Sequence, residues 1–240
     1  MDGVQTLVLL HAFPLDSRMW DAVRDRLSDH VRLITPDQRG AGDAPPSLDT
    51  VATDVLALLD DHGVEQAVLG GCSMGGYASM AVLRAAPHRV SGLVLIDTKA
   101  PADTDEARAG RLDVAARAER EGPGHWLADS LLPNLLARPD SGEVRRWIGE
   151  QDGASVAWAQ RAMAARPDSR DTLRAVVVPT LVVHGAQDAL MPVTLAEEMT
   201  ELTRGQLVVL PNAGHLAPVE EPDAVASAII SWLPLTNPAS

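Results

Sequence analysis

The segment LGGCSMGGY, residues 69–77, joins an apolar run to a helical pattern through four glycines and a single serine, Ser73. Glycine loses more backbone freedom on folding than any other residue, so such a segment is costly unless the turn needs it. Within it, Gly71-Cys72-Ser73-Met74-Gly75 fits the pattern G-x-S-x-G between a strand and a helix. Small residues at Gly71 and Gly75 keep strand and helix from colliding in a sharp turn, which exposes the serine at the carboxyl end of a strand.

Short apolar runs alternate with helical patterns along most of the chain. The runs are continuous rather than alternating, which is typical of strands buried on both faces of a parallel sheet. The predicted strands span residues 6–10, 31–34, 67–69, 92–96, 180–183 and 206–210. Helices are predicted over residues 17–27, capped by Ser17, and over residues 50–62, 74–86, 195–202 and 224–232. This alternation predicts a doubly wound α/β domain.

The alternation stops between Ile96 and Pro179, where the periodicity is helical and no strand stands out. We therefore assign residues 1–99 and 176–240 to an α/β core and residues 100–175 to an inserted helical cap. Trp126, Trp147 and Trp158 lie in this cap segment. They could line a substrate pocket, or they could pack the cap against the core.

Composition limits the partners and the compartment. The 240 residues carry a formal net charge of −13, which argues against nucleic acid and anionic membranes as partners. The single cysteine, Cys72, allows no intrachain disulfide and fits a reducing cytoplasm. The apolar run at residues 7–10 is too short for a signal peptide or a membrane span. We expect a cytoplasmic protein, and the sequence makes no prediction of its oligomeric state.

Three residues in separate segments have the chemistry of a nucleophile, a base and an orienting acid. A serine hydroxyl needs a base, and the base needs an orienting group. His215 follows the last predicted strand, and Asp188 follows the strand before it. The order Ser73, Asp188, His215 is the order that a nucleophile turn in an α/β sheet uses. Asp97, at the end of the fourth strand, is the alternative acid.

Backbone amides complete the predicted site. The N–H groups of Phe13 and Met74 are the expected oxyanion-hole donors, and the ring of Phe13 is expected to wall the acyl pocket. Lys99, Arg108 and Arg111 could attract a carboxylated substrate, although a solvated helix face is the favoured interpretation. Because the histidines show no metal-ligand spacing, we predict neither a metal site nor a cofactor.

The chain resembles the α/β-hydrolase superfamily in motifs that run from near its first residue to near its last. The matching segments are residues 11–14, 37–42, 71–76, 184–188 and 214–215. Within that superfamily it is similar to the small esterases and 3-oxoadipate enol-lactonase-like hydrolases. Only about five residues precede the first strand, where the family has a hairpin. The resemblance therefore implies six parallel strands in the order 2-1-3-4-5-6, without that hairpin or with a short one.

These observations favour a serine hydrolase that cleaves a small carboxylic ester or lactone through an acyl-enzyme on Ser73. Cofactor-free perhydrolase or haloperoxidase activity and C–C bond hydrolysis use the same three residues and remain alternatives. A receptor that binds a small molecule without turnover is also possible, since fold does not fix function. The presence of all three residues makes it the least favoured alternative.

Overall fold

The computed structural model describes residues 4–38, 40, 43–140 and 142–233 of the chain. Arg39, Ala41 and Gly42, which belong to the second motif of the resemblance, lie outside the described residues.

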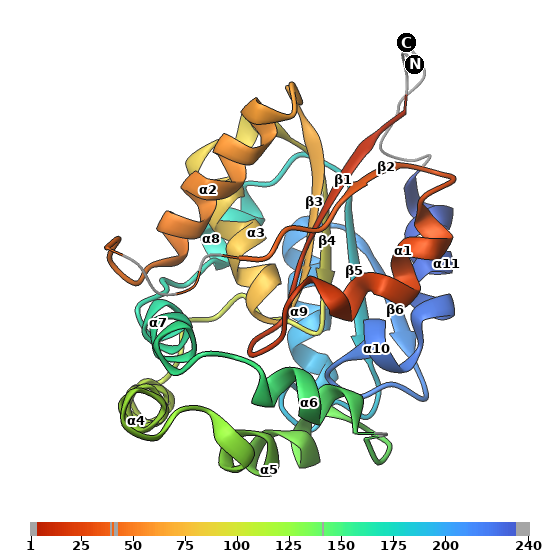
Figure 1. Cartoon of the computed structure of the whole chain (residues 1–240). Coiled ribbons are helices and arrows are strands. Elements are labelled where there is room, and N and C mark those ends of the chain that lie inside the picture. Colours follow the sequence, from red (N-terminus) through yellow and green to blue (C-terminus); the bar gives the residue numbers. More distant parts are fainter. Residues whose placement is uncertain (1–3, 39, 41–42, 141, 234–240) are drawn as a thin grey trace.

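Six parallel strands form one sheet in the order β2-β1-β3-β4-β5-β6 (Figure 1). The strands are β1 (Thr6–Leu10), β2 (Arg32–Ile34), β3 (Ala67–Cys72), β4 (Val90–Ile96), β5 (Thr180–Gly185) and β6 (Gln206–Leu210). The α/β class, the parallel pairing and the strand order are confirmed. Strands β3 and β5 run further than predicted, because residues 70–72 continue the ladder with β4 and residues 184–185 continue the ladder with β6.

The strand β1 shows why a continuous apolar run suits this sheet. Successive side chains of a strand point to opposite faces. Leu7 and Leu9 pack into one buried cluster, whereas Val8 and Leu10 pack into the other. The first cluster includes residues of α1 (Asp21–Leu27) and α11 (Pro222–Trp232). The second includes residues of α2 (Leu48–Asp61), α3 (Met74–Ala85) and α9 (Val193–Thr203). Helices therefore cover both faces of the sheet (Figure 1).

The helix predicted from Ser17 to Leu27 is instead two elements. A 3-10 helix, Ser17–Trp20, precedes α1. The cap is Asp16 rather than Ser17, because the Asp16 carboxylate accepts the backbone N–H of Arg18. The side chain of Arg18 also binds that carboxylate through Nε and Nη2, so Asp16 accepts three N–H groups of Arg18.

In the described part of the segment between β4 and β5 there are five helices. They are α4 (Asp105–Glu121), α5 (Gly124–Leu135), α6 (Glu143–Gly149), α7 (Gly153–Ala164) and α8 (Arg170–Arg174). Helices α4 to α7 gather beyond one end of the sheet (Figure 1). The two ends of this helical segment lie side by side, since the Ser169 N–H donates to the Ala100 carbonyl over 2.9 Å. Among the described residues, no helix combines the length and apolar character needed to cross a bilayer.

Candidate active site

Ser73 occupies a strained turn between β3 and α3. Its backbone angles are φ 52° and ψ −110°, outside the regions that non-glycine residues favour. A Cβ added at Gly75 would lie 2.0 Å from the Leu10 carbonyl oxygen, and one at Gly71 would lie 2.2 Å from the Gly75 carbonyl carbon. Both positions therefore require glycine for close approach. The turn leaves Ser73 largely buried, with 8% of its surface exposed.

The structure brings Ser73, His215 and Asp188 into one hydrogen-bonded chain. The Nε2 atom of His215 lies 2.8 Å from the Ser73 Oγ, and its Nδ1 lies 2.7 Å from the Asp188 Oδ2. A carboxylate only accepts hydrogen bonds, so Nδ1 carries the imidazole proton. The Nε2 atom is then left to accept the serine O–H.

Backbone amides orient Asp188 toward the imidazole. Its Oδ1 accepts the N–H groups of Leu190 and Met191 over 2.8 and 3.0 Å. The Asp188 side chain is 0% exposed and that of His215 is 2% exposed, so little solvent competes for their hydrogen bond. The arrangement can therefore take a proton from Ser73 and hold it on an oriented imidazole.

Asp97, the alternative acid, has a different position in the structure. Its Oδ1 accepts the Gly185 N–H over 2.8 Å, and its Oδ2 accepts the Ala217 N–H over 3.1 Å. It therefore ties the end of β4 to the two loops that carry Asp188 and His215. Burial raises the pKa of the Asp97 carboxyl well above its usual range, and the nearby charge of Asp188 adds to this, against the opposing amide bond from Gly185.

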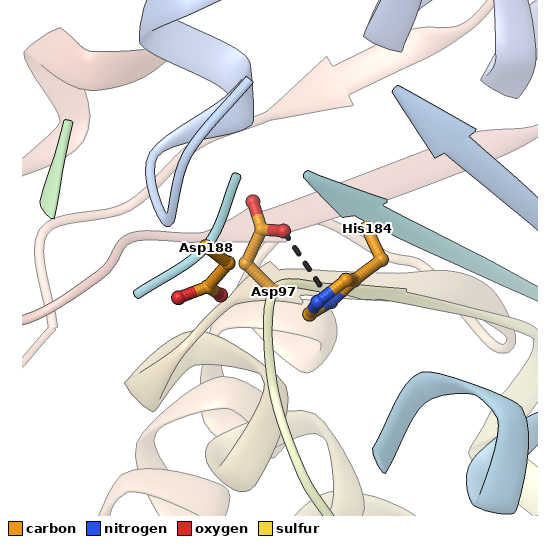
Figure 2. Close-up of side chains that lie close together, drawn as sticks. All are labelled: Asp97, His184 and Asp188. Atoms are coloured by element: carbon orange, nitrogen blue, oxygen red, sulfur yellow. Dashed lines mark ion pairs between the residues drawn. The ribbon is translucent and has the colours of Figure 1, made fainter. Parts of the chain in front are cut away.

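Asp97, His184 and Asp188 form the one group among the described residues whose ligand atoms lie close enough to hold a metal ion (Figure 2). Every carboxylate oxygen of the two acids already accepts at least one hydrogen bond. The Nε2 of His184 lies 3.0 Å from the Met191 carbonyl, and burial lowers the pKa of this imidazole. Only His184 Nδ1, 3.6 Å from Asp97 Oδ1, lacks a hydrogen-bond partner. We assign no metal to a group with one uncommitted ligand atom.

The loop after β1 is held by a pair of reciprocal bonds. Gln38 donates its backbone N–H to His11 Nε2 over 2.9 Å and its side-chain Nε2 to the His11 carbonyl over 2.7 Å. Burial lowers the pKa of His11, which favours the neutral imidazole that can accept at Nε2. The Ala12 N–H is engaged by the Met19 sulfur over 3.1 Å. These contacts fix the segment that carries Phe13.

A cavity of about 50 Å³ opens beside this loop. The described part of its lining combines the loop, the start of α3 and the segment between β4 and β5, and it comprises His11, Phe13, Pro14, Leu15, Gln38, Gly40, Met74, Gln151, Ser155, Val156 and Ala159. It includes both predicted oxyanion residues. The sequence offered no signal for Gln151, which enters the cavity from a connection between two cap helices.

The three cap tryptophans do not line this cavity. Trp126 donates its Nε1–H to the Gly122 carbonyl over 2.7 Å, and Trp158 donates to the Ala44 carbonyl over 3.0 Å. Trp147 is 7% exposed and packs in the cluster that contains β1 residues. In this arrangement their contacts are those of cap packing.

Comparisons with known proteins extend over nearly the whole chain. A model of the alpha/beta hydrolase family matches residues 7–228. A thermophilic esterase from Thermogutta terrifontis has a TM-score of 0.92 at 39% sequence identity, over 98% of this chain and 92% of that one. The enol-lactonase from Burkholderia xenovorans LB400 has a TM-score of 0.86 at 27% identity, over 97% and 92% of the two chains. A pimeloyl-[acyl-carrier protein] methyl ester esterase from Pectobacterium carotovorum is 28% identical over 245 residues, 96% of this chain and 94% of the relative.

Proposed function

The chain belongs to the alpha/beta hydrolase family, and from this premise we propose that it is a serine hydrolase that cleaves a carboxylic ester or lactone through an acyl-enzyme on Ser73. The observation that carries the proposal is the hydrogen-bonded chain from Ser73 through His215 to Asp188, with contacts of 2.8 and 2.7 Å. A hydroxyl, an imidazole and a carboxylate in this order are what acyl transfer by serine requires.

In the proposed first step, the Ser73 Oγ attacks the substrate carbonyl carbon while His215 Nε2 takes the hydroxyl proton. Asp188 stabilises the imidazolium that forms. The carbonyl oxygen becomes an alkoxide, which the N–H groups of Phe13 and Met74 would bind. When this intermediate collapses, the ester C–O bond breaks and His215 returns the proton to the leaving alkoxide.

Water completes the proposed cycle. His215 removes a proton from a water molecule, whose oxygen attacks the acyl carbon bound to Ser73. Collapse of this second intermediate breaks the bond to Ser73, and the proton returns to the serine oxygen. The products are a carboxylic acid and an alcohol, which are one hydroxy acid when the substrate is a lactone.

The similarity to an esterase and an enol-lactonase supports an ester or lactone as the reacting group. Within the proposal, residues 1–99 and 176–240 are the catalytic core, and residues 100–175 are a cap that covers the substrate. The lining of the cavity supports this division, since it combines core residues such as Phe13 with cap residues such as Val156.

Replacement of the nucleophile tests the proposal. We expect Ser73→Ala to lower kcat for p-nitrophenyl butyrate by at least about a thousandfold, because no other group can form the acyl-enzyme. The far-UV circular dichroism spectrum should stay that of the wild type. Ser28→Ala, at an exposed serine whose hydroxyl donates to the Asp25 carbonyl, is the matched control and should retain full activity. Turnover by Ser73→Ala at the wild-type rate would refute the mechanism.

A further inference from the structure

Two glutamine side chains reach the cavity beside Phe13 and Met74, one from the core and one from the cap. A glutamine amide has two N–H donors and a carbonyl acceptor, and nothing in its shape alone decides which end faces a ligand. Here the surrounding hydrogen bonds decide it for both residues.

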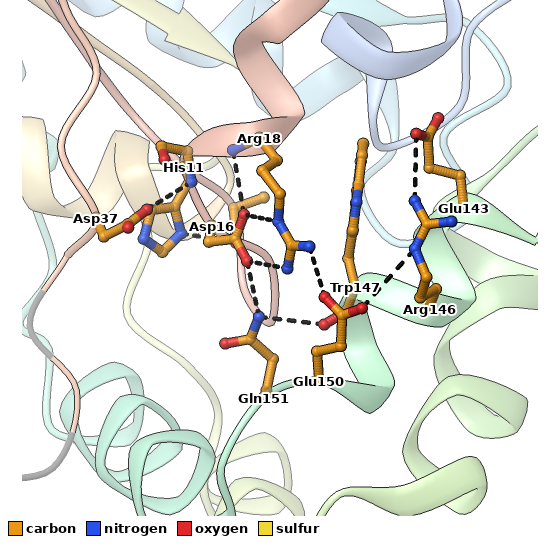
Figure 3. A network of polar contacts seen from close by, with 11 residues as sticks. His11, Asp16, Arg18, Asp37, Glu143, Arg146, Trp147, Glu150 and Gln151 are labelled. Carbon is orange, nitrogen blue, oxygen red and sulfur yellow. Dashed lines mark hydrogen bonds and ion pairs between the residues drawn. The ribbon is translucent and has the colours of Figure 1, made fainter.

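The orientation of Gln151 is fixed by two acceptors. Its Nε2 donates to Asp16 Oδ2 over 3.0 Å and to the Trp147 carbonyl over 3.1 Å. A carboxylate and a backbone carbonyl cannot donate, so the amide cannot be turned around. Figure 3 shows the nitrogen between these two partners and the oxygen pointing away from both. Both N–H donors are therefore used, and Oε1 remains for another group.

The rest of this network holds Gln151 in place. Arg18 binds Asp16 through Nε and Nη2 over 2.8 and 2.7 Å, and its Nη1 pairs with Glu150 over 2.5 Å (Figure 3). The guanidinium thus bridges the segment after β1 to the residue next to Gln151. Side chains held by several partners lose little further entropy when a ligand arrives.

The amide of Gln38 is also oriented by its contacts, but its oxygen is closed off from the cavity. Its Nε2 is committed to the His11 carbonyl over 2.7 Å, and its Oε1 is buried with no hydrogen-bond partner in the described chain. An unpaired buried acceptor costs free energy unless a ligand or water satisfies it.

The other described polar side chains of the lining are already engaged. His11 accepts at Nε2 from Gln38, and its Nδ1 lies 3.1 Å from the Ala12 carbonyl. The hydroxyl of Ser155 hydrogen-bonds to Asp152. The other described lining residues are apolar and include Leu15, Val156 and Ala159. Among the described residues, the cavity therefore offers a ligand apolar contact and the amide oxygen of Gln151.

We propose that this cavity selects esters whose acyl or alcohol part carries a hydroxyl or N–H group, which donates a hydrogen bond to Gln151 Oε1. The inference rests on the proposed function, since it takes Phe13 and Met74 as the donors to the reacting carbonyl. A substrate without such a donor leaves Gln151 Oε1 desolvated and unpaired, which is how polar sites reject apolar analogues.

Matched ester pairs test the inference. Methyl β-hydroxybutyrate is compared with its O-methyl ether for the acyl side, and ethylene glycol monobutyrate with its methyl ether for the alcohol side. Methylation removes the donor but keeps the oxygen. In at least one pair we expect kcat/KM of the hydroxyl form to exceed that of the ether by roughly tenfold, the effect of one hydrogen bond. A ratio within about twofold in both pairs would overturn the inference.

The variant Gln151→Met separates recognition from steric exclusion of the ether methyl group. Methionine keeps the length of the side chain and removes the amide, so the hydroxyl-to-ether ratio should fall toward one. Gln66→Met is the control, since Gln66 is an exposed glutamine that donates to the His88 carbonyl and should leave the ratio unchanged. Retention of the wild-type ratio by Gln151→Met would contradict the assignment.

Failure of the proposed function gives a different result. It would leave wild-type enzyme inactive on all butyrate esters, whatever their hydroxyl groups. Binding of the same pairs to Ser73→Ala, measured by calorimetry, needs no turnover. We expect tighter binding of the hydroxyl form, and equal binding of both forms in both pairs would overturn the inference on its own.

Discussion

At the scale of single residues, Gly75 is the position in the turn with the least room for a side chain. The carbonyl oxygen of Leu10 lies 2.0 Å from the place that a Cβ at this position would occupy. We expect Gly75→Ala to lower the free energy of unfolding by at least about 2 kcal/mol, because backbone must move to admit the methyl group. Urea denaturation of the purified variant measures this.

Gly110 is the matched comparison. It lies inside α4, and an added Cβ there meets nothing within 4 Å. Gly110→Ala should therefore stabilise the protein by about 0.5–1 kcal/mol through helix propensity alone. If both alanine variants had the wild-type free energy of unfolding, the close approach at Gly75 would not be the reason for glycine there.

The sequence could predict which residues would meet in the candidate site, because each follows a strand and parallel strands end at one edge of a sheet. It could not choose firmly between Asp97 and Asp188, since both stand at strand ends. The choice depends on which carboxylate the His215 imidazole faces, and this is a matter of loop conformation. The catalytic roles of Ser73, Asp188 and His215 stay predictions.

At the scale of elements, the segments that lead into and out of the cap are joined by a buried ion cluster. The Asp103 side chain, 1% exposed, accepts from Arg111 Nε over 2.6 Å and from Arg166 Nη2 over 2.7 Å, and Lys99 lies 3.0 Å away. Arg166 follows α7, whereas Asp103 precedes α4, so their pair closes the base of the cap. Lys99 and Arg111 therefore bind Asp103, in contrast to the solvated helix face favoured from the sequence.

Removing the charge of Asp103 should destabilise the protein strongly. Asp103→Asn leaves Arg166, whose side chain is 3% exposed, without its carboxylate, and we expect a loss of about 3 kcal/mol at neutral pH. Glu119→Gln, which breaks an exposed pair with Arg161 between α4 and α7, should stay close to wild type in urea denaturation.

The loss of stability in Asp103→Asn should depend on pH, in a direction that follows from the pKa of Asp103. Burial raises the pKa of Asp103, but Arg111 and Arg166 outweigh it, so the pKa lies below the usual value. The stabilisation that ionised Asp103 provides is therefore fully present above its unfolded-state pKa, about 3.9. It is lost as the pH falls through the lower pKa that Asp103 has in the folded state. The difference between wild type and Asp103→Asn should shrink on acidification. A difference that grew as the pH fell would contradict this account.

Strand positions were the most predictable elements, because apolar runs buried on both faces leave few other interpretations. The start of α1 was not predictable, since both Asp16 and Ser17 are good helix caps. The Asp103 cluster and the contact of Gln151 with Asp16 could not be predicted from the sequence either. They join residues far apart in the chain, and no local periodicity marks them.

At the scale of the whole molecule, the helices between β4 and β5, which we propose form a cap, share hydrophobic clusters with the sheet. Leu127, Leu132 and Ile148 of the cap pack in the same cluster as Leu7 and Leu9 of β1. Met163 packs in the other cluster, with Val8. A segment that shares its buried surface with the core on both sides of the sheet should not unfold by itself.

We therefore expect one cooperative unfolding transition. Urea curves followed by far-UV circular dichroism and by tryptophan fluorescence should coincide, because Trp20 and Trp232 report on the core and Trp126, Trp147 and Trp158 on the cap. Two separated transitions would mean that the cap is an independent unit.

The central claim is that distant segments assemble a nucleophile at Ser73, and covalent trapping tests it most directly. A p-nitrophenyl alkylphosphonate reacts with an activated serine, releasing p-nitrophenolate and leaving a stable phosphonyl group on the oxygen. Mass spectrometry of the treated protein, intact and after digestion, should find one adduct per chain, on the peptide that contains Ser73, and none in Ser73→Ala. An adduct on another residue, or one that forms equally fast in Ser73→Ala, would contradict the account.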